Sequence, residues 1–256
     1  MTIETKERTS KTTNNNENMA KDYSEDQLIQ RSAAELMEKE LGWTSVYAFD
    51  KEVLGTNGTL GRTSYHEVLL AGRFRKALKT LNPWLTDKQL QECVERMTEH
   101  MSSQTLMQIN EQKYQYIKDG VPVTRVKPNG ETEEVRAKVI DFASPEKNDF
   151  LCVREMWVYG ALYHRRADIV GFVNGLPLLF MELKNHDVEV VDAFNKNYRD
   201  YLDTIPQLFY HNAFIMFSNG LEARVGTIDS KWEFFHEWKR LTEQEAGNIE
   251  LPTMLR

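Results

Sequence analysis

The stretch RRADIVGFVNGLPLLFMELKN at residues 165–185 decides the fold of the chain. Valine, leucine, isoleucine and phenylalanine dominate two runs within it, and the dipeptide Asn174-Gly175 separates these runs. Such residues are typical of strands, and Asn-Gly between two of these runs is a strong hairpin signal. The stretch therefore predicts two antiparallel strands joined by a tight connection.

The segments around this hairpin add further strands and helices. Residues 150–160, FLCVREMWVYG, form a third apolar run, and residues 213–217 form a fourth. Apolar residues at helical spacing predict helices over 24–41, 64–79, 86–100, 190–202 and 232–240. Residues 105–150 are interpreted as short strands and turns. This order of elements predicts the α/β class, with a mixed sheet flanked by helices.

Composition limits the organisation and the partners of the chain. We interpret residues 1–23, which are polar, as a disordered leader, and residues 24–256 as a single domain with a helical elaboration at its start. The net charge of −7 argues against tight, unaided binding to DNA. The sequence shows no signal segment, no membrane span and no zinc-like spacing of its 2 cysteines, so a cytoplasmic protein is expected.

Asp168, Glu182 and Lys184 are the candidate catalytic residues. Side chains alternate along a strand, so Glu182 and Lys184 share one face. A two-residue turn would place Asp168 opposite Met181, on the wrong face. A three-residue loop, or a bulge, would place Asp168 opposite Glu182 instead. We therefore predict the longer loop or a bulge.

Two carboxylates beside one ammonium suit a divalent cation. Mg²⁺ takes one or two carboxylates and keeps positions for water and a substrate phosphate. The metal can acidify a bound water, and Lys184 would orient or deprotonate that water and stabilise charge in the transition state. The alternative is that Glu182 and Lys184 are ordinary surface residues, because the pattern Glu-x-Lys is frequent by chance.

The stretch that contains these residues resembles the PD-(D/E)xK nuclease motif of the restriction subunits of type I restriction enzymes. Further segments match in order, among them HEVLLAGRFRKALKTLNPWL, VIDFASPEKNDF and IPQLFYHNAFIMFSNG, so the resemblance covers residues 24–240. It implies a restriction-endonuclease-like core and an Mg²⁺-dependent endonuclease domain at the N-terminal end of such a subunit. A stand-alone repair or recombination nuclease and a non-catalytic docking module remain alternatives.

The resemblance also implies roles for individual residues. Asp168 and Glu182 match the metal-binding acids, and Lys184 matches the catalytic lysine. Glu67 is the candidate for an additional metal ligand from the first core helix. Asn197 and Tyr201 stand where the family has a QxxxY motif that positions DNA or the site. The family usually has proline where this chain has Ala167, and glutamine where it has Asn197.

Partners and a second cofactor follow from the same resemblance. Full-length restriction subunits carry an ATP-driven DNA translocase after the nuclease domain, and this chain contains no Walker A sequence. We therefore expect a fragment without the motor, with ATP used only by the full-length subunit. The expected partners are double-stranded DNA and the methyltransferase and specificity subunits, with no membrane.

Overall fold

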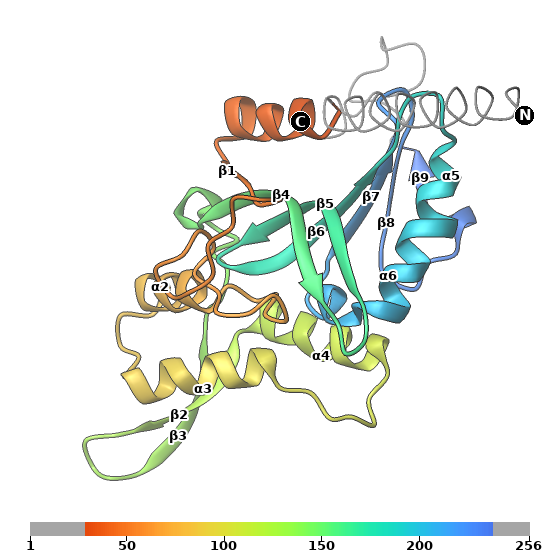
Figure 1. Ribbon diagram of the computed structural model, residues 1–256. Helices are drawn as coiled ribbons and strands as arrows, with labels where there is room; N and C mark the ends of the chain where they lie inside the picture. Colours follow the sequence, from red (N-terminus) through yellow and green to blue (C-terminus); the bar gives the residue numbers. More distant parts are fainter. Residues whose placement is uncertain (1–28, 238–256) are drawn as a thin grey trace, which may run out of the picture.

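Seven strands form one mixed sheet in the order β1-β4-β5-β6-β7-β8-β9 (Figure 1). The computed structural model describes residues 29–237, so the proposed leader at 1–23 lies outside the described residues. The sheet with its flanking helices confirms the α/β class and is consistent with a restriction-endonuclease-like core. Its strands are β1 (Thr44–Tyr47), β4 (Phe150–Tyr159), β5 (His164–Val173), β6 (Leu176–Leu183), β7 (Phe214–Ser218), β8 (Ala223–Gly226) and β9 (His236–Glu237).

The centre of the sheet is the predicted antiparallel run β4-β5-β6. On either side of it the pairing is parallel, because β1 runs parallel to β4 and β7 runs parallel to β6. Adjacent parallel strands need a long crossover. Between β6 and β7 that crossover is helical and consists of α5 (Val190–Asp192), the π-helical segment η2 (Ala193–Tyr198), α6 (Arg199–Thr204) and the short η3 (Pro206–Phe209).

Each face of the sheet has its own hydrophobic cluster. The crossover helices cover one face, where Phe194 and Tyr198 pack against Phe180 and Phe217 of the sheet (Figure 1). Residues 29–41 form a helix on the other face, where Ala33, Ala34 and Met37 pack with Cys152, Ile169 and Met181. A strand buried on both faces reads as a nearly continuous apolar run, which explains the composition of β4, β5 and β6.

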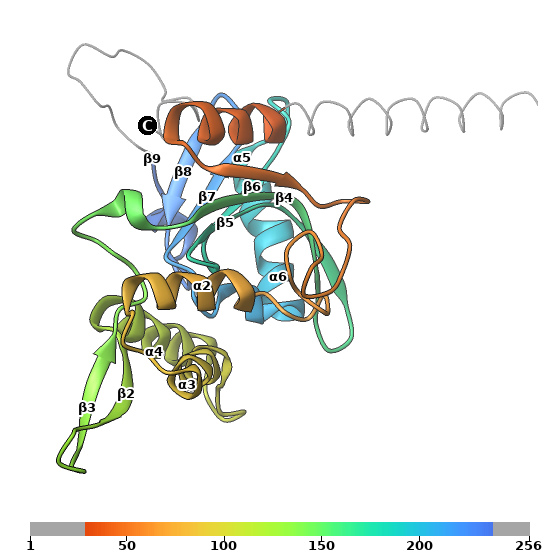
Figure 2. The same cartoon turned by 90° about the vertical axis from the view of Figure 1, so that its left-hand side faces the viewer.

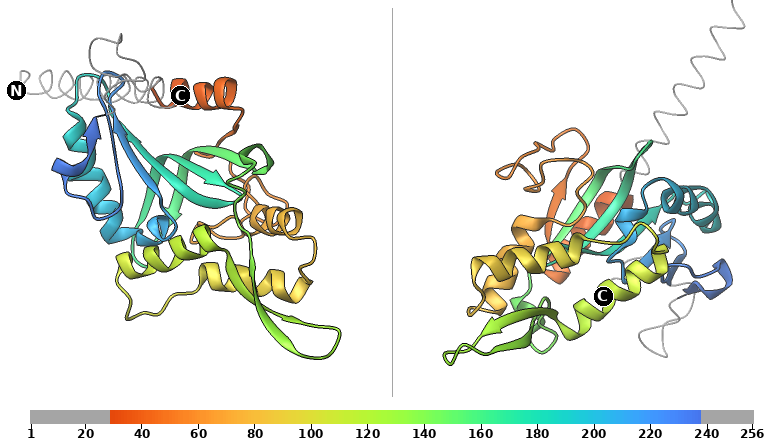
Figure 3. Two further views of the ribbon diagram at one scale, coloured as in Figure 1. Left: turned by 180° about the vertical axis from the view of Figure 1, so that it is seen from behind. Right: turned by 90° about the horizontal axis from the view of Figure 1, so that it is seen from below.

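A second group of elements packs around its own core beside the end of the β5–β6 hairpin. It comprises α2 (Ala71–Leu81), α3 (Asp87–Thr98), α4 (Leu106–Asp119), β2 (Val121–Val126) and β3 (Thr132–Ala137). The β2–β3 hairpin projects away from the large sheet (Figures 2 and 3). The turn glycine Gly175 joins the two groups: its carbonyl accepts from Leu70, and a Cβ there would lie 2.6 Å from the Leu70 carbonyl oxygen.

Several sequence-based expectations need correction. The interpretation of residues 105–150 as strands and turns is wrong at its start, because α4 occupies Leu106–Asp119 behind a Thr105–Gln108 capping box. The helix expected over 64–79 begins only at Ala71. The helix expected over 232–240 is wrong in its described part, which contains a 3₁₀ turn, η4 (Trp232–Phe234), followed by β9. Among residues 29–237, no helix has the length and apolar character needed to cross a membrane.

Candidate active site at the β5–β6 hairpin

A tight turn followed by a bulge sets the register of the β5–β6 hairpin. Asn174 and Gly175 have φ values of 54° and 80°, and Val173 pairs with Leu176, so the connection has two residues. The expected three-residue loop is therefore wrong. The register then shifts between Gly171 and Phe172, which confirms the bulge alternative.

The bulge moves the acidic side chains into line. Beyond it Ile169 pairs with Met181, and continuing this register places Asp168 opposite Glu182. A bulge inserts one extra residue and turns the following side chains to the other face. The extra residue is thus what brings together two acids that a regular two-residue hairpin would separate.

Backbone and side-chain donors fix Asp168 at the start of the site. The backbone N–H of Leu183 donates to Oδ2 of Asp168 at 2.7 Å. The Gln30 side chain, from the helix over residues 29–41, donates through Nε2 to Oδ1 at 3.1 Å. Asp168 is therefore held between the next strand and a helix far away in sequence.

Glu182 and Lys184 project from β6 and the residue that follows it. Nζ of Lys184 lies 3.0 Å from Oε1 of Glu182, and the Glu182 residue is only 1% exposed. The Lys184 side chain keeps 19% of its surface. The ammonium thus stays within reach of a substrate while the carboxylate beneath it is buried.

Burial and the nearby charge of Glu182 both raise the pKa of the Asp168 carboxyl. Its removal from water raises the pKa of the carboxyl well above the ordinary value, and the charge of Glu182 raises it further. The Leu183 N–H and the Lys184 charge oppose this rise in pKa only in part. Two buried acids that disfavour each other's ionisation are a chemical setting that a divalent cation would relieve.

The residues present fit such a cation through two carboxylates. Within residues 29–237 no three Asp, Glu, His or Cys side chains are grouped closely enough to hold a metal by themselves. Mg²⁺ is commonly bound by one or two carboxylates, with water and substrate oxygens completing its shell. Asp168 and Glu182 both line an open cavity of about 470 Å³ that has room for these further ligands.

Tyr201 and Asn197 lie on the same cavity, on the helical side of the sheet. The Tyr201 hydroxyl donates to the backbone carbonyl of Arg166 at 2.8 Å. Burial raises its pKa well above normal, as do the charges of Glu182 and Asp168, whereas a hydrogen bond with the Asn197 side chain lowers it. Asn197 belongs to the π-helical turn η2, and such turns are frequent at functional sites.

Glu67 lies apart from this cavity. It precedes α2 rather than belonging to a helix, and its carboxylate accepts from the Thr63 hydroxyl at 2.5 Å. It is not among the residues that line the cavity with Asp168 and Glu182. The cavity is lined by Gln30, Glu155, Trp157, His164, Arg165, Arg166, Asp168, Glu182, Leu183, Lys184, Asn197 and Tyr201.

The sequence analysis missed Gln30 and Glu155, which line the same cavity. Arg166 pairs with the buried Glu155 at 2.5 Å and lies over the ring of Phe49. Glu155 has a φ of 56°, a left-handed conformation that costs a non-glycine residue about 1–3 kcal/mol. Two adjacent charges inside the apolar run at 150–160 were the available signal.

Comparison with known proteins places the chain among restriction subunits. A family model described as the N terminus of the type I restriction enzyme R protein matches residues 22–234. The chain is 30% identical over 213 residues to the HindI endonuclease subunit of a type I restriction enzyme from Haemophilus influenzae, which covers 82% of this chain and 20% of that protein.

Two further relatives give the same picture. A Methanocaldococcus jannaschii protein named as the MjaIXP endonuclease subunit of a type I restriction enzyme is 31% identical over 230 residues, covering 88% of this chain and 21% of that protein. A Staphylococcus aureus endonuclease subunit, SauMSSORF170P, is 27% identical over 194 residues, 72% of this chain and 19% of that protein. The chain thus spans about a fifth of the length of these relatives.

Proposed function

Because the chain belongs to the family of type I restriction enzyme R protein N termini, we propose that it is an Mg²⁺-dependent endonuclease domain that hydrolyses phosphodiester bonds of double-stranded DNA. The observation that carries this proposal is the buried juxtaposition of Asp168 and Glu182, with Lys184 at 3.0 Å from Glu182, in an open cavity. The perturbed pKa of Asp168 supports it, because perturbed acids in clefts concentrate at functional sites.

In this proposal each side chain has its own role in in-line hydrolysis of the phosphodiester bond. Asp168 and Glu182 would hold the metal, which supplies an acidified water and neutralises charge on the phosphate. The Leu183 N–H and Gln30 orient the Asp168 carboxylate. Lys184 would orient the attacking water or stabilise the phosphate charge as it develops.

The remaining residues have supporting roles in this proposal. Tyr201 fixes the backbone of Arg166, two residues before Asp168, and Asn197 fixes Tyr201, so the pair positions the strand that carries the first acid. Glu67 remains a predicted metal ligand, and it would need to leave Thr63 to act as one.

The proposal extends to the assembly in which the domain acts. Cleavage would follow ATP-driven translocation by motor domains of the full-length subunit, in a complex with specificity and methyltransferase subunits. The net charge of −7 supports this division, because affinity for DNA would then come from the other parts.

Calorimetric titration with Mn²⁺ tests the metal site directly. The wild-type chain is expected to bind Mn²⁺, and Asp168→Ala is expected to lose most of the binding heat. Asp203→Ala, which removes an exposed acid from α6, serves as the matched control and should behave like the wild type. Identical traces for Asp168→Ala and the wild type would overturn the proposal and favour a non-catalytic docking module.

A further inference from the structure

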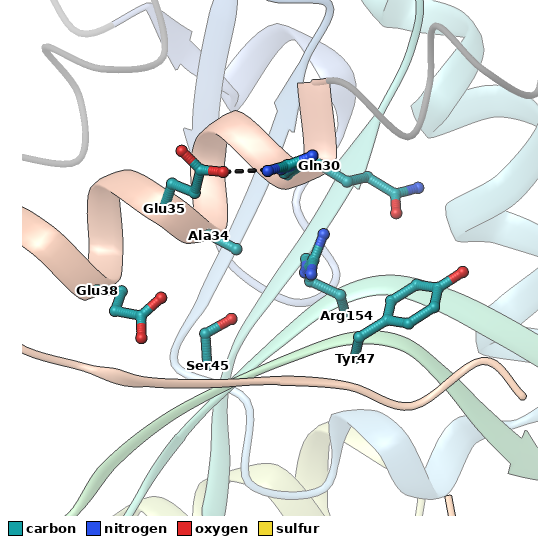
Figure 4. Close-up of a pocket in the computed structure, with 8 residues that line it drawn as sticks. Gln30, Ala34, Glu35, Glu38, Ser45, Tyr47 and Arg154 are labelled. Atoms are coloured by element: carbon teal, nitrogen blue, oxygen red, sulfur yellow. Dashed lines mark hydrogen bonds and ion pairs between the residues drawn. The ribbon is translucent and has the colours of Figure 1, made fainter. Parts of the chain in front are cut away.

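A second cavity adjoins the catalytic one and shares Gln30 with it. It has a volume of about 420 Å³ and lies between the helix over residues 29–41 and strands β1 and β4. Figure 4 shows Arg154 reaching from the sheet toward the helix, with Tyr47 beside it. Gln30 lines both cavities, and its amide is bonded to Asp168, so the second cavity begins directly beside the first acid.

Arg154 lines this second cavity with its guanidinium group. Its Nε is buried without a hydrogen bond, and its side chain makes no ion pair with any residue in the range 29–237. Its contact is with the Tyr47 ring, 5.1 Å from the guanidinium carbon to the ring centroid. Tyr47 is also its partner in the β1–β4 register, so stacking holds the planar group in place.

Strand β4, which lines both cavities, is irregular at Glu155. Val153 and Met156 both pack into the core beneath the crossover helices, although regular alternation would put residues an odd number apart on opposite faces. The left-handed φ of Glu155 marks this irregularity. Arg154 lines the second cavity, and the next residue, Glu155, lines the catalytic one.

We propose that this second cavity binds a backbone phosphate of DNA next to the phosphate that is cut, through the guanidinium of Arg154. This inference rests on the proposed function, and it adds a contact with the DNA substrate to those proposed above. Guanidinium groups match phosphate oxygens with a fork of N–H donors. One strand of duplex DNA carries a phosphate about every 3.4 Å of helix axis, so a strand entering the catalytic cavity brings further phosphates beside it.

Two glutamates, Glu35 and Glu38, also line the second cavity. Glu35 is already neutralised by ion pairs with Arg31 and Lys39. Glu38 has no ion pair within residues 29–237 and lines the same cavity. The negative charge of Glu38 would repel a phosphate bound in this cavity, so removing that charge should tighten the binding of DNA. Removing the positive charge of Arg154 should weaken it.

Equilibrium binding to a short DNA duplex, without a divalent cation and over a series of salt concentrations, tests this pair of effects. Arg154→Gln should weaken binding about tenfold, as the loss of one charge-assisted hydrogen bond does, and lower the slope of log K against log salt by about one. Glu38→Gln should bind more tightly than the wild type. Lys118→Gln on α4 removes the same charge from an exposed position and should keep the wild-type slope.

A second measurement keeps the test decisive if Arg154→Gln does not fold. The side-chain Nε–H resonance of Arg154, assigned by its loss in Arg154→Lys, should shift on titration with the duplex. It should shift less with inorganic phosphate at equal concentration; an equal shift would mean a general anion site and would overturn the inference.

The outcomes separate the two proposals. Duplex binding that is unchanged in Arg154→Gln, or unchanged or weaker in Glu38→Gln, sinks the second phosphate site but leaves the nuclease proposal intact. If the wild-type chain binds Mn²⁺ but not the duplex even at the lowest salt concentration, the inference fails and the nuclease proposal stands. If it binds neither, the proposed function fails, and this inference fails with it.

Discussion

The loop before α2 buries Arg62 against Glu52, whereas the β5–β6 hairpin buries Asp168 against Glu182. Arg62 donates through Nε and Nη2 to the two Glu52 oxygens at 2.6 Å, and both side chains are at most 1% exposed. The backbone carbonyls of Glu67 and Trp157 accept further hydrogen bonds from Nη1 and Nη2. The two opposite charges therefore neutralise each other, and every guanidinium nitrogen donates at least one hydrogen bond.

The hairpin has the reverse arrangement. Asp168 and Glu182 carry the same charge when ionised, and their proximity raises the pKa of Asp168 beyond the effect of burial. Two like charges held close together in the interior cost stability, even with Lys184 paired to Glu182. The first region is a structural ion pair, whereas the second is the site at which we propose that a cation and a substrate bind.

The largest expected effect is on the structural pair. Arg62→Met should lower the free energy of unfolding by about 3–5 kcal/mol, because it leaves the Glu52 charge buried without its partner. Urea denaturation measures the change. The double variant Arg62→Met with Glu52→Met should recover much of the loss, and a single variant as stable as the wild type would remove the contrast between the two regions.

Substitution of Lys184 should have the opposite result: a large effect on the rate of DNA cleavage and little effect on the free energy of unfolding. Lys184→Ala is expected to lower single-turnover cleavage of DNA by the enzyme that contains this chain by about 10²–10³-fold, the usual loss when one group that stabilises developing charge is removed. Lys118→Ala is the exposed control. Cleavage at the wild-type rate by Lys184→Ala would contradict the role given to the ammonium.

A smaller effect concerns the pH dependence of the metal-free chain. Because the pKa of Asp168 is raised above 3.8 in the folded state, the folded chain binds more protons than the unfolded chain between that value and the folded pKa. Stability from this group is therefore present at low pH and lost as the pH rises through that window.

Asp168→Asn should remove this part of the pH dependence, as should saturating Mg²⁺ on the wild type. Thermal unfolding from pH 4 upward, compared among the wild type, Asp168→Asn and Asp203→Asn, measures it. If the unfolding temperature falls with pH as steeply in Asp168→Asn as in the wild type, Asp168 is not the source of this pH dependence.

Local sequence rules predicted much of the fold. The helix α3 begins after the Thr86 cap, close to the expected start, because Thr86 and Gln89 form a capping box that depends on four consecutive residues. The three central strands are those predicted from their apolar composition. The rules failed at α4, where Ile109 and Ile117 on a polar helix give a weak periodic signal, and before α2, where Glu67 is held by Thr63.

The sequence predicted which residues gather at the candidate site but not what surrounds them. Asp168, Glu182 and Lys184 line one cavity as expected, and Asn197 and Tyr201 join them. Gln30 is more than a hundred residues away from Asp168 in sequence, so no local pattern indicated their hydrogen bond. Glu155 and Arg154 required the irregular backbone of β4, which is stabilised by packing on both faces.

The sequence by itself determined the hairpin, the strand composition and the choice of Asp168, Glu182 and Lys184 as candidate site residues, because turn preference and side-chain alternation act between near neighbours. Tertiary structure decided that a bulge rather than a longer loop aligns Asp168 with Glu182, and that Gln30 joins two cavities. A one-residue shift of register reverses every later side chain. The choice between a bulge and a longer loop therefore depends on the packing of the whole sheet against α2 and the helix over residues 29–41.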